Sequence, residues 1–151
     1  DCEQIILSEL EYVLKKIFAT PNNESAWNYL HGLYVQHDSI KGKIIDWCKS
    51  ILPSNSNEQS ISPEAISSSS RTGTNLSKNI HFMGMAASIF EDYSLIQLAN
   101  FIPNSTDTPN PKSYFEDAQK LFLMLKAADQ LRVKYWSRRA EKCTHHLKNL
   151  N

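Results

Sequence analysis

The stretch Pro21-Asn22-Asn23-Glu24-Ser25-Ala26-Trp27-Asn28-Tyr29-Leu30 decides the fold expected for this chain of 151 residues. Pro21 ends a preceding helix because proline cannot continue the backbone hydrogen-bond ladder, and Asn23 is a good N-cap for the helix that follows. Trp27 lies early in that second helix, where its large ring can pack between helical hairpins. The stretch therefore predicts a corner between two helices.

Apolar residues on both sides of this corner recur at the three- and four-residue spacing of helices. Over about residues 3–19 they are Ile6, Leu10, Val13, Leu14, Ile17 and Phe18. In the second helix they are Trp27, Leu30, Leu33 and Tyr34. After a break at residues 37–39, a third helix ending before Pro53 is marked by Ile40, Ile44, Trp47, Cys48 and Ile51. The first fifty residues thus predict three antiparallel helices joined by tight turns.

Residues 53–79 differ in composition from the helices around them. Nine of these 27 residues are serine, and apolar periodicity is almost absent. Such a segment buries too little apolar surface to offset the entropy of ordering, so a flexible insertion is predicted. A plain surface loop is the simpler interpretation, and a regulatory phosphorylation segment is the alternative.

Helical periodicity resumes at about Ile80 and continues to about Phe101, with apolar positions at Phe82, Met83, Ala86, Ile89, Phe90, Tyr93 and Leu98. Three prolines and several small polar residues predict a loop over residues 103–111. The next helix is expected to start with a capping box, because Ser113 and Glu116 have its spacing. Its inward-facing residues are expected to be Ala118, Leu121, Phe122 and Leu125.

A last helix is predicted from about Asp129 to Leu147, with apolar positions at Leu131, Tyr135 and Trp136. No segment of the chain alternates apolar and polar residues as a strand does. The predicted fold class is therefore all-α, in a single helical region covering residues 1–151.

Charge and cysteine content limit the possible functions. Lysine plus arginine and aspartate plus glutamate both number 16, so no strong net field is available to bind nucleic acid or an anionic membrane. No apolar run is long enough for a membrane span. The cysteines are odd in number and widely spaced, which favours reduced thiols and a cytoplasmic location: Cys2, Cys48 and Cys143. Because the chain starts Asp-Cys-Glu, without an initiator Met, we expect it to be a piece of a longer protein.

Two other patterns contain the residue types of a metal site or an RNA-binding surface, but a solvated helix surface explains both better. Cys143-Thr-His145-His146 contains metal-ligand types, but adjacent helical residues point about 100° apart and ligate one ion poorly, so no metal site is expected. The last helix carries a basic stripe interleaved with aromatic residues, formed by Lys134, Arg138, Arg139, Lys142 and Lys148. In a neutral chain this stripe favours a solvated face or an acidic protein partner over RNA.

Three blocks of the chain carry a family resemblance. The stretch 21–30 resembles the P-x-N-x-x-A-W repeat of protein prenyltransferase α subunits, and looks most like the last well-formed repeat in the α-subunit family of protein farnesyltransferase and type I geranylgeranyltransferase. Ile89-Phe90-Glu91-Asp92 is similar to the family's I-Y-E-D, and Asp129-Gln-Leu-Arg132-Val-Lys-Tyr135-Trp136 is similar to its D-x-I-R-x-x-Y-W. The blocks follow the family's order and span about residues 1–147.

The resemblance implies a helical-hairpin solenoid, in which antiparallel helix pairs form a crescent around a barrel-shaped β subunit. The heterodimer transfers farnesyl or geranylgeranyl from its diphosphate to the cysteine of a C-terminal CaaX sequence. Zinc, held by β, generates the attacking thiolate, and magnesium is a further candidate cofactor of the holoenzyme. The expected partners are the β subunit and, in the complex, CaaX proteins and isoprenyl diphosphate, with no nucleic acid.

The resemblance also implies roles for individual residues. In the family, a lysine of an earlier repeat, five residues before that repeat's tryptophan, contacts the diphosphate. Asn22 stands at that position here, so this chain is expected to be the C-terminal part of the α subunit, with no catalytic residue and no metal ligand. Residues expected to form the repeat motif and pack the hairpins are Pro21, Asn23, Ala26, Trp27, Leu30, Tyr135 and Trp136. Candidates for the partner interface are Asn28, Tyr29 and Arg132. The alternative is a free-standing tetratricopeptide-like scaffold that binds peptides.

Overall fold

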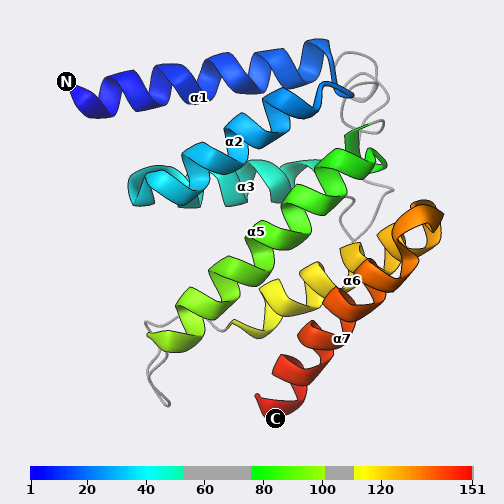
Figure 1. The fold of residues 1–151 in the computed structure, drawn as a ribbon. Helices are drawn as coiled ribbons and strands as arrows, with labels where there is room; N and C mark the ends of the chain where they lie inside the picture. The colour runs from blue at the N-terminus through cyan, green and yellow to red at the C-terminus, as the bar shows by residue number, and fades with distance from the viewer. Residues whose placement is uncertain (53–75, 101–110, 151) are drawn as a thin grey trace, which may run out of the picture. The chain divides into compact units, whose positions relative to one another are not determined.

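The computed structural model describes residues 1–52, 76–100 and 111–150 (Figure 1). Every regular element within these ranges is helical, which confirms the all-α fold class. The arrangement of the hairpins into a solenoid stays a prediction. The chain divides into two compact units, Asp1–Phe82 and Met83–Asn151, and each is described by itself.

The first unit begins with three helices close to the predicted bounds. They are α1 (Cys2–Ala19), α2 (Glu24–Gln36) and α3 (Lys41–Ile51), and the 3-10 helix η1 (Asp38–Ile40) occupies the predicted break before α3. The Asn23 side chain accepts from the Ser25 backbone N–H at 3.1 Å, which confirms the predicted N-cap of α2. The helices turn apolar faces inward, so the first unit has a core of its own: Leu10, Val13 and Ile17 of α1, Leu30, Leu33 and Tyr34 of α2, and Ile44, Ile45 and Cys48 of α3.

Large rings from four different segments meet in this core. The ring of Trp27 lies 6.3 Å from that of Trp47 and 6.1 Å from that of Phe82. Trp47 also lies 6.2 Å from Phe18, at the end of α1, in an edge-to-face arrangement. Such aromatic pairs add to the free energy gained from burial. The cluster therefore joins α1, α2, α3 and the start of the next helix.

That next helix, α5 (Ile80–Ala99), starts in the first unit and continues into the second. Asn79 caps it, since its Oδ1 accepts from the backbone N–H groups of His81 at 2.9 Å and Phe82 at 3.2 Å. Leu76 is 1 % exposed. The predicted insertion over 53–79 therefore ends too late, because its last residues bury an apolar side chain and cap a helix. Residues 53–75 lie outside the described residues.

The second unit contains the rest of α5 and an antiparallel hairpin of α6 (Lys112–Ala128) and α7 (Val133–Asn149), joined through the 3-10 helix η3 (Gln130–Arg132) (Figure 1). The hairpin buries Phe115, Ala118, Leu121, Phe122 and Leu125 of α6, and Trp136, Ala140 and Cys143 of α7. The four residues predicted to face inward on α6 are thus confirmed.

Two local predictions for this hairpin are wrong. The N-cap of α6 is Pro111, without a side-chain cap hydrogen bond, so Ser113 lies inside the first turn and forms no capping box. Pro111 suits the start of a helix because its φ of −68° is already helical. The helix predicted from about Asp129 starts later, as α7 at Val133, because a 3-10 turn occupies Gln130–Arg132, and Leu131 in that turn is 98 % exposed.

Candidate functional site

The corner between α1 and α2 is fixed by a hydrogen bond from its tryptophan. The Trp27 Nε1–H donates to the backbone carbonyl of Pro21 at 2.7 Å, while the Trp27 ring is 3 % exposed. Ala26 and Leu30, on either side of Trp27, are also buried. The indole thus packs in the core and satisfies its polar group on the turn that precedes its own helix, which ties the turn to the core.

Asn79 adds a second set of bonds to the same corner. Its Nδ2–H group donates to the carbonyl of Pro21 at 3.3 Å and to Oδ1 of Asn22 at 3.1 Å. The Pro21 carbonyl therefore accepts from both Trp27 and Asn79, and the cap of α5 is joined to the α1–α2 turn. Asn22 stands at the position of the family's lysine, and its side-chain oxygen accepts this hydrogen bond from Asn79.

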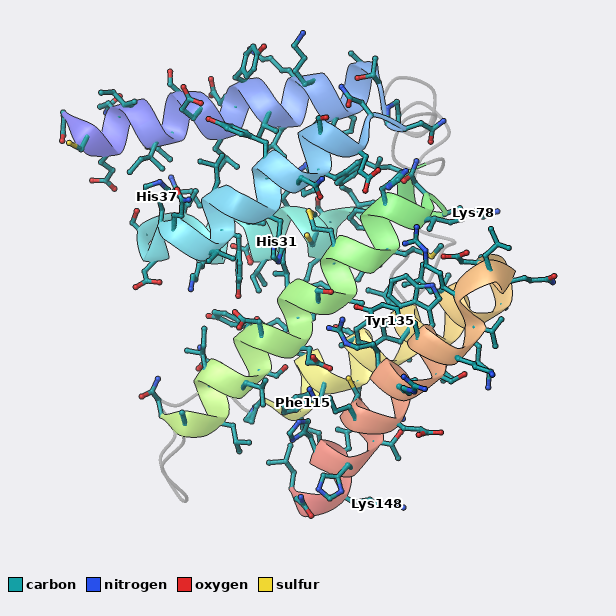
Figure 2. The ribbon with its side chains drawn as sticks, viewed as in Figure 1. His31, His37, Lys78, Phe115, Tyr135 and Lys148 are labelled. Carbon is teal, nitrogen blue, oxygen red and sulfur yellow. The ribbon has the colours of Figure 1, made fainter. Side chains whose placement is uncertain are left out.

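The α1–α2 pair forms a groove of about 530 Å³. α1 lines it with Cys2, Ile5, Ile6 and Glu9. From α2 and the residue after it, the lining residues are Asn28, Tyr29, Gly32, Leu33, Gln36 and His37. His37 is the C-cap residue of α2 (Figure 2). Asn28 and Tyr29, the residues predicted to face a partner, both line this groove and are exposed.

Tyr29 and Glu9 connect the two helices across the groove. The Tyr29 hydroxyl donates to Oε2 of Glu9. This hydrogen bond, with smaller contributions from burial and from the Glu9 charge, raises the pKa of Tyr29 above its ordinary value. Tyr29 is 45 % exposed, so part of this residue remains accessible to a ligand beside the Glu9 carboxylate.

Gly32 leaves room at the α2 side of the groove. A Cβ atom added at Gly32 would meet no heavy atom within 4 Å. Gly32→Ala is expected to raise the free energy of unfolding by about 0.5–1 kcal/mol, because glycine inside a helix is entropically costly and the added methyl group meets open space. Urea denaturation followed by circular dichroism measures this change, and a loss of stability would contradict the open geometry.

The second unit contains a tryptophan whose indole N–H is hydrogen-bonded to the turn before its helix, as that of Trp27 is. The Trp136 Nε1–H donates to Oδ2 of Asp129 at 3.0 Å, across the turn before α7. Arg132, in that turn, lies 3.7 Å from the same carboxylate oxygen. Tyr135 is half exposed at the start of α7 (Figure 2), with its ring 4.7 Å from that of Trp136. Trp136 thus joins its turn to the core of the second unit, as Trp27 does in the first.

A largely buried polar cluster links α5 to α7 in this unit. Arg139 Nη2 lies 3.2 Å from Oε1 of Glu91, whose residue is 7 % exposed, and 3.4 Å from Oγ of Ser88. The other guanidinium nitrogen, Nη1, donates to the Tyr135 hydroxyl at 2.7 Å. The Cys143 thiol donates to Oε2 of Glu91 at 3.3 Å. The carboxylate of Glu91 is therefore paired through both oxygens, as a buried charge requires.

This cluster corrects the interpretation of the basic stripe on α7. Arg139 does not lie on a solvated face, because its side chain is only 22 % exposed and its guanidinium carbon lies 4.7 Å from the centre of the Phe122 ring. Glu91 belongs to the second motif block, but no local sequence pattern indicates Arg139 as its partner. Asn79 was also missed, although an asparagine directly before a helical stretch is a recognisable N-cap signal.

Thiol reactivity is expected to differ sharply among the three cysteines. Burial raises the pKa of Cys48 to about 12, and burial followed by the Glu91 charge raises the pKa of Cys143 to about 12. At pH 8 their thiolates are then roughly one part in ten thousand, and the thiolate is the reactive form. We expect alkylation of the folded protein to label the exposed Cys2 first, as followed by mass spectrometry. Rapid labelling of Cys48 or Cys143 before unfolding would contradict this expectation.

The predicted site residues lie in two groups, one in each compact unit. Those of the first unit are Pro21, Asn23, Ala26, Trp27, Asn28, Tyr29 and Leu30, at the corner and the adjacent groove. Those of the second unit are Arg132, Tyr135 and Trp136, around the turn before α7. In the parts of the chain that the structure describes, no group of three or more His, Cys, Asp or Glu side chains is arranged to hold a metal ion. Within the same parts, the helices lack the combined length and apolarity needed to cross a bilayer.

Comparisons of the chain with known protein families, curated proteins and solved structures found no match.

Proposed function

We propose that the chain is part of the α subunit of a protein prenyltransferase of the farnesyltransferase and type I geranylgeranyltransferase kind, and that it serves to hold the β subunit. The observation that carries this proposal is the corner at Pro21. There the residues of the motif have distinct physical tasks: Asn23 caps α2, Trp27 fills the core, and the Trp27 indole N–H bonds back to the turn.

The second and third motif blocks add support because their residues meet within one unit. Glu91 of the second block pairs with Arg139, which in turn donates to the hydroxyl of Tyr135 in the third block. Trp136 of the third block packs near α5 at Gly84, where an added Cβ atom would lie 3.4 Å from the indole ring. Motif residues that lie about 45 positions apart in the sequence thus contribute to one packed arrangement.

In this proposal the chain acts as a scaffold and supplies no reacting group. Asn22, at the position of the family's diphosphate-binding lysine, is an uncharged amide bonded to Asn79. The exposed residues Asn28, Tyr29 and Arg132 are the proposed contacts to a partner. Zinc would be held by β, where it supplies a thiolate nucleophile from the CaaX cysteine, and magnesium would be a further cofactor of the complex. The proposed location is the cytoplasm.

The composition of the native complex tests this assignment. The gene product that contains this chain, purified from its source, should be bound one-to-one to a second, helical-barrel subunit, with about one zinc ion per heterodimer. Mass spectrometry identifies the subunits and elemental analysis counts the metal. A purified protein that lacks both the partner and zinc would exclude the assignment.

A peptide-binding helical scaffold is the second candidate, and the groove between α1 and α2 is the observation that favours it. Its volume of about 530 Å³ falls in the range of ligand pockets, and its lining combines apolar and polar side chains. A scaffold of this kind would bind short peptides as a free-standing chain without a zinc-containing subunit. Measured peptide binding together with the absence of the heterodimer would favour the scaffold over the prenyltransferase.

A further inference from the structure

We propose that the groove between α1 and α2 is a docking site for a basic amphipathic helix of a partner protein, one that presents aliphatic side chains flanked by lysine or arginine. This inference does not depend on the prenyltransferase assignment, because it uses only the surface of the α1–α2 pair.

The charge of the first two helices selects a cationic partner. Residues 1–36 contain five carboxylate side chains and two lysines, and both lysines lie in the last turns of α1. Lys16 is placed over the ring of Tyr12, with its Nζ atom 5.6 Å from the ring centre. Among the groove's lining residues, Glu9 is the carboxylate and none is lysine or arginine. A cationic side chain entering the groove would meet attraction from Glu9 without a competing lysine or arginine in the lining, although His37 also lines the groove.

The shape of the groove selects aliphatic side chains beside that cation. Ile5 is 62 % exposed, and Ile6 and Leu33 also line the groove. Tyr29 is half exposed and hydrogen-bonded to the Glu9 carboxylate, and an aromatic ring beside a carboxylate favours lysine and arginine. A volume of about 530 Å³ accommodates a few inserted side chains of a helix whose body stays outside.

A helix is the expected conformation of the bound segment. The described elements of the first unit are all helical, so these residues offer no sheet edge to which an extended peptide could add. Two packed helices instead present a surface between their axes, into which a third helix places side chains at positions i, i+3, i+4 and i+7. Asn28 and Gln36 on α2 supply amide groups along this surface for polar contacts at its rim.

Peptide binding to the whole chain tests the proposal. The probe is a labelled synthetic helix of about five turns, with leucine along one stripe and lysine on the flanking positions. Two comparison peptides carry glutamate in place of lysine, or serine in place of leucine. Fluorescence anisotropy at about 0.15 M salt measures the affinities. We expect the leucine–lysine peptide to bind at least about tenfold more tightly than either comparison peptide. Equal binding of the glutamate peptide would overturn the charge argument.

A pair of glycine variants tests whether the peptide binds in the groove or elsewhere on the surface. Gly32→Leu places a side chain into the groove, whereas Gly42→Leu adds the same side chain to α3, away from the groove's lining. Both positions have no heavy atom within 4 Å of an added Cβ, so both variants should fold. Gly32→Leu is expected to weaken binding of the leucine–lysine peptide about tenfold, and Gly42→Leu is expected to leave it unchanged. Wild-type affinity in Gly32→Leu would overturn the proposal.

A carboxylate variant and the oligomeric state complete the test. Glu9→Gln is expected to weaken binding severalfold and to reduce its salt dependence, because the lining loses its carboxylate. Unchanged affinity and unchanged salt dependence would overturn the proposal. Sedimentation equilibrium examines whether the occupant is instead a second copy of the chain, whose α7 is also basic. Self-association abolished by Gly32→Leu would assign the groove to that second copy and overturn the proposal.

Discussion

Replacing Trp27 with alanine is expected to lower the free energy of unfolding by roughly 3–5 kcal/mol, the range found for large aromatic residues removed from cores. The ring is 3 % exposed and lies within 6.3 Å of the rings of Trp47 and Phe82, so its removal leaves a cavity among α2, α3 and the start of α5. The variant also removes one donor to the Pro21 carbonyl. Urea denaturation followed by far-ultraviolet circular dichroism measures the loss.

Two further variants separate the ring from its hydrogen bond. Trp27→Phe keeps most of the buried area but lacks the indole N–H, so we expect a smaller loss of about 1–3 kcal/mol. Val35→Ala, on the same helix, changes a side chain that is 58 % exposed and should shift stability by less than about 0.5 kcal/mol. A loss below about 1 kcal/mol in Trp27→Ala would show that the corner does not depend on this ring.

Replacing Arg139 with alanine is expected to lower the free energy of unfolding by about 2–4 kcal/mol, since it leaves a buried carboxylate without its charged partner. Glu91 is 7 % exposed, and its carboxylate bonds to Arg139 and to the thiol of Cys143. The Arg139 side chain keeps some contact with solvent, which places the expected loss below the largest values for fully buried pairs. Chemical denaturation of the whole chain gives the change.

A double variant distinguishes the unpaired charge from lost packing. Glu91→Leu combined with Arg139→Met replaces the ion pair by apolar groups of similar size, and this often restores stability in other proteins. We therefore expect the double variant to be more stable than Arg139→Ala alone. Lys134→Ala, on the exposed side of α7, serves as the control and should be nearly neutral. Equal losses in the single and double variants would show that packing, rather than an uncompensated charge, causes the effect.

The helices of the first unit could be predicted because several local signals agree there. The stripe from Ile6 to Phe18, the break at Pro21 and the cap at Asn23 all favour the same corner, and the structure places helix ends within a residue or two of the predicted bounds. Leu131 illustrates the opposite case. It continues an apolar pattern in the sequence, but a 3-10 turn before α7 changes its direction and leaves it 98 % exposed.

The contacts that join distant segments could not be predicted in the same way. Asn79 stands among serines and other polar residues, and nothing local indicates that it reaches Pro21 and Asn22, 58 and 57 positions earlier. In the sequence, Arg139 is one of several basic residues that form a stripe along the last helix, and such a stripe predicts a solvated face. Its pairing with Glu91 depends on how α5 packs against α7. Such pairs are set by tertiary packing, whereas helical periodicity is a property of neighbouring residues. The groove is a further example, because its two walls come from different helices.

Prenyl transfer by the purified native complex is the most direct test of the assignment to a prenyltransferase α subunit. The gene product that contains this chain, purified with its bound partner, would be incubated with labelled farnesyl or geranylgeranyl diphosphate and a peptide ending in a CaaX sequence. We predict zinc-dependent transfer of the label to the cysteine peptide, and no transfer to a peptide with serine in place of that cysteine. An intact, zinc-supplemented complex that transfers neither isoprenyl group would contradict the assignment.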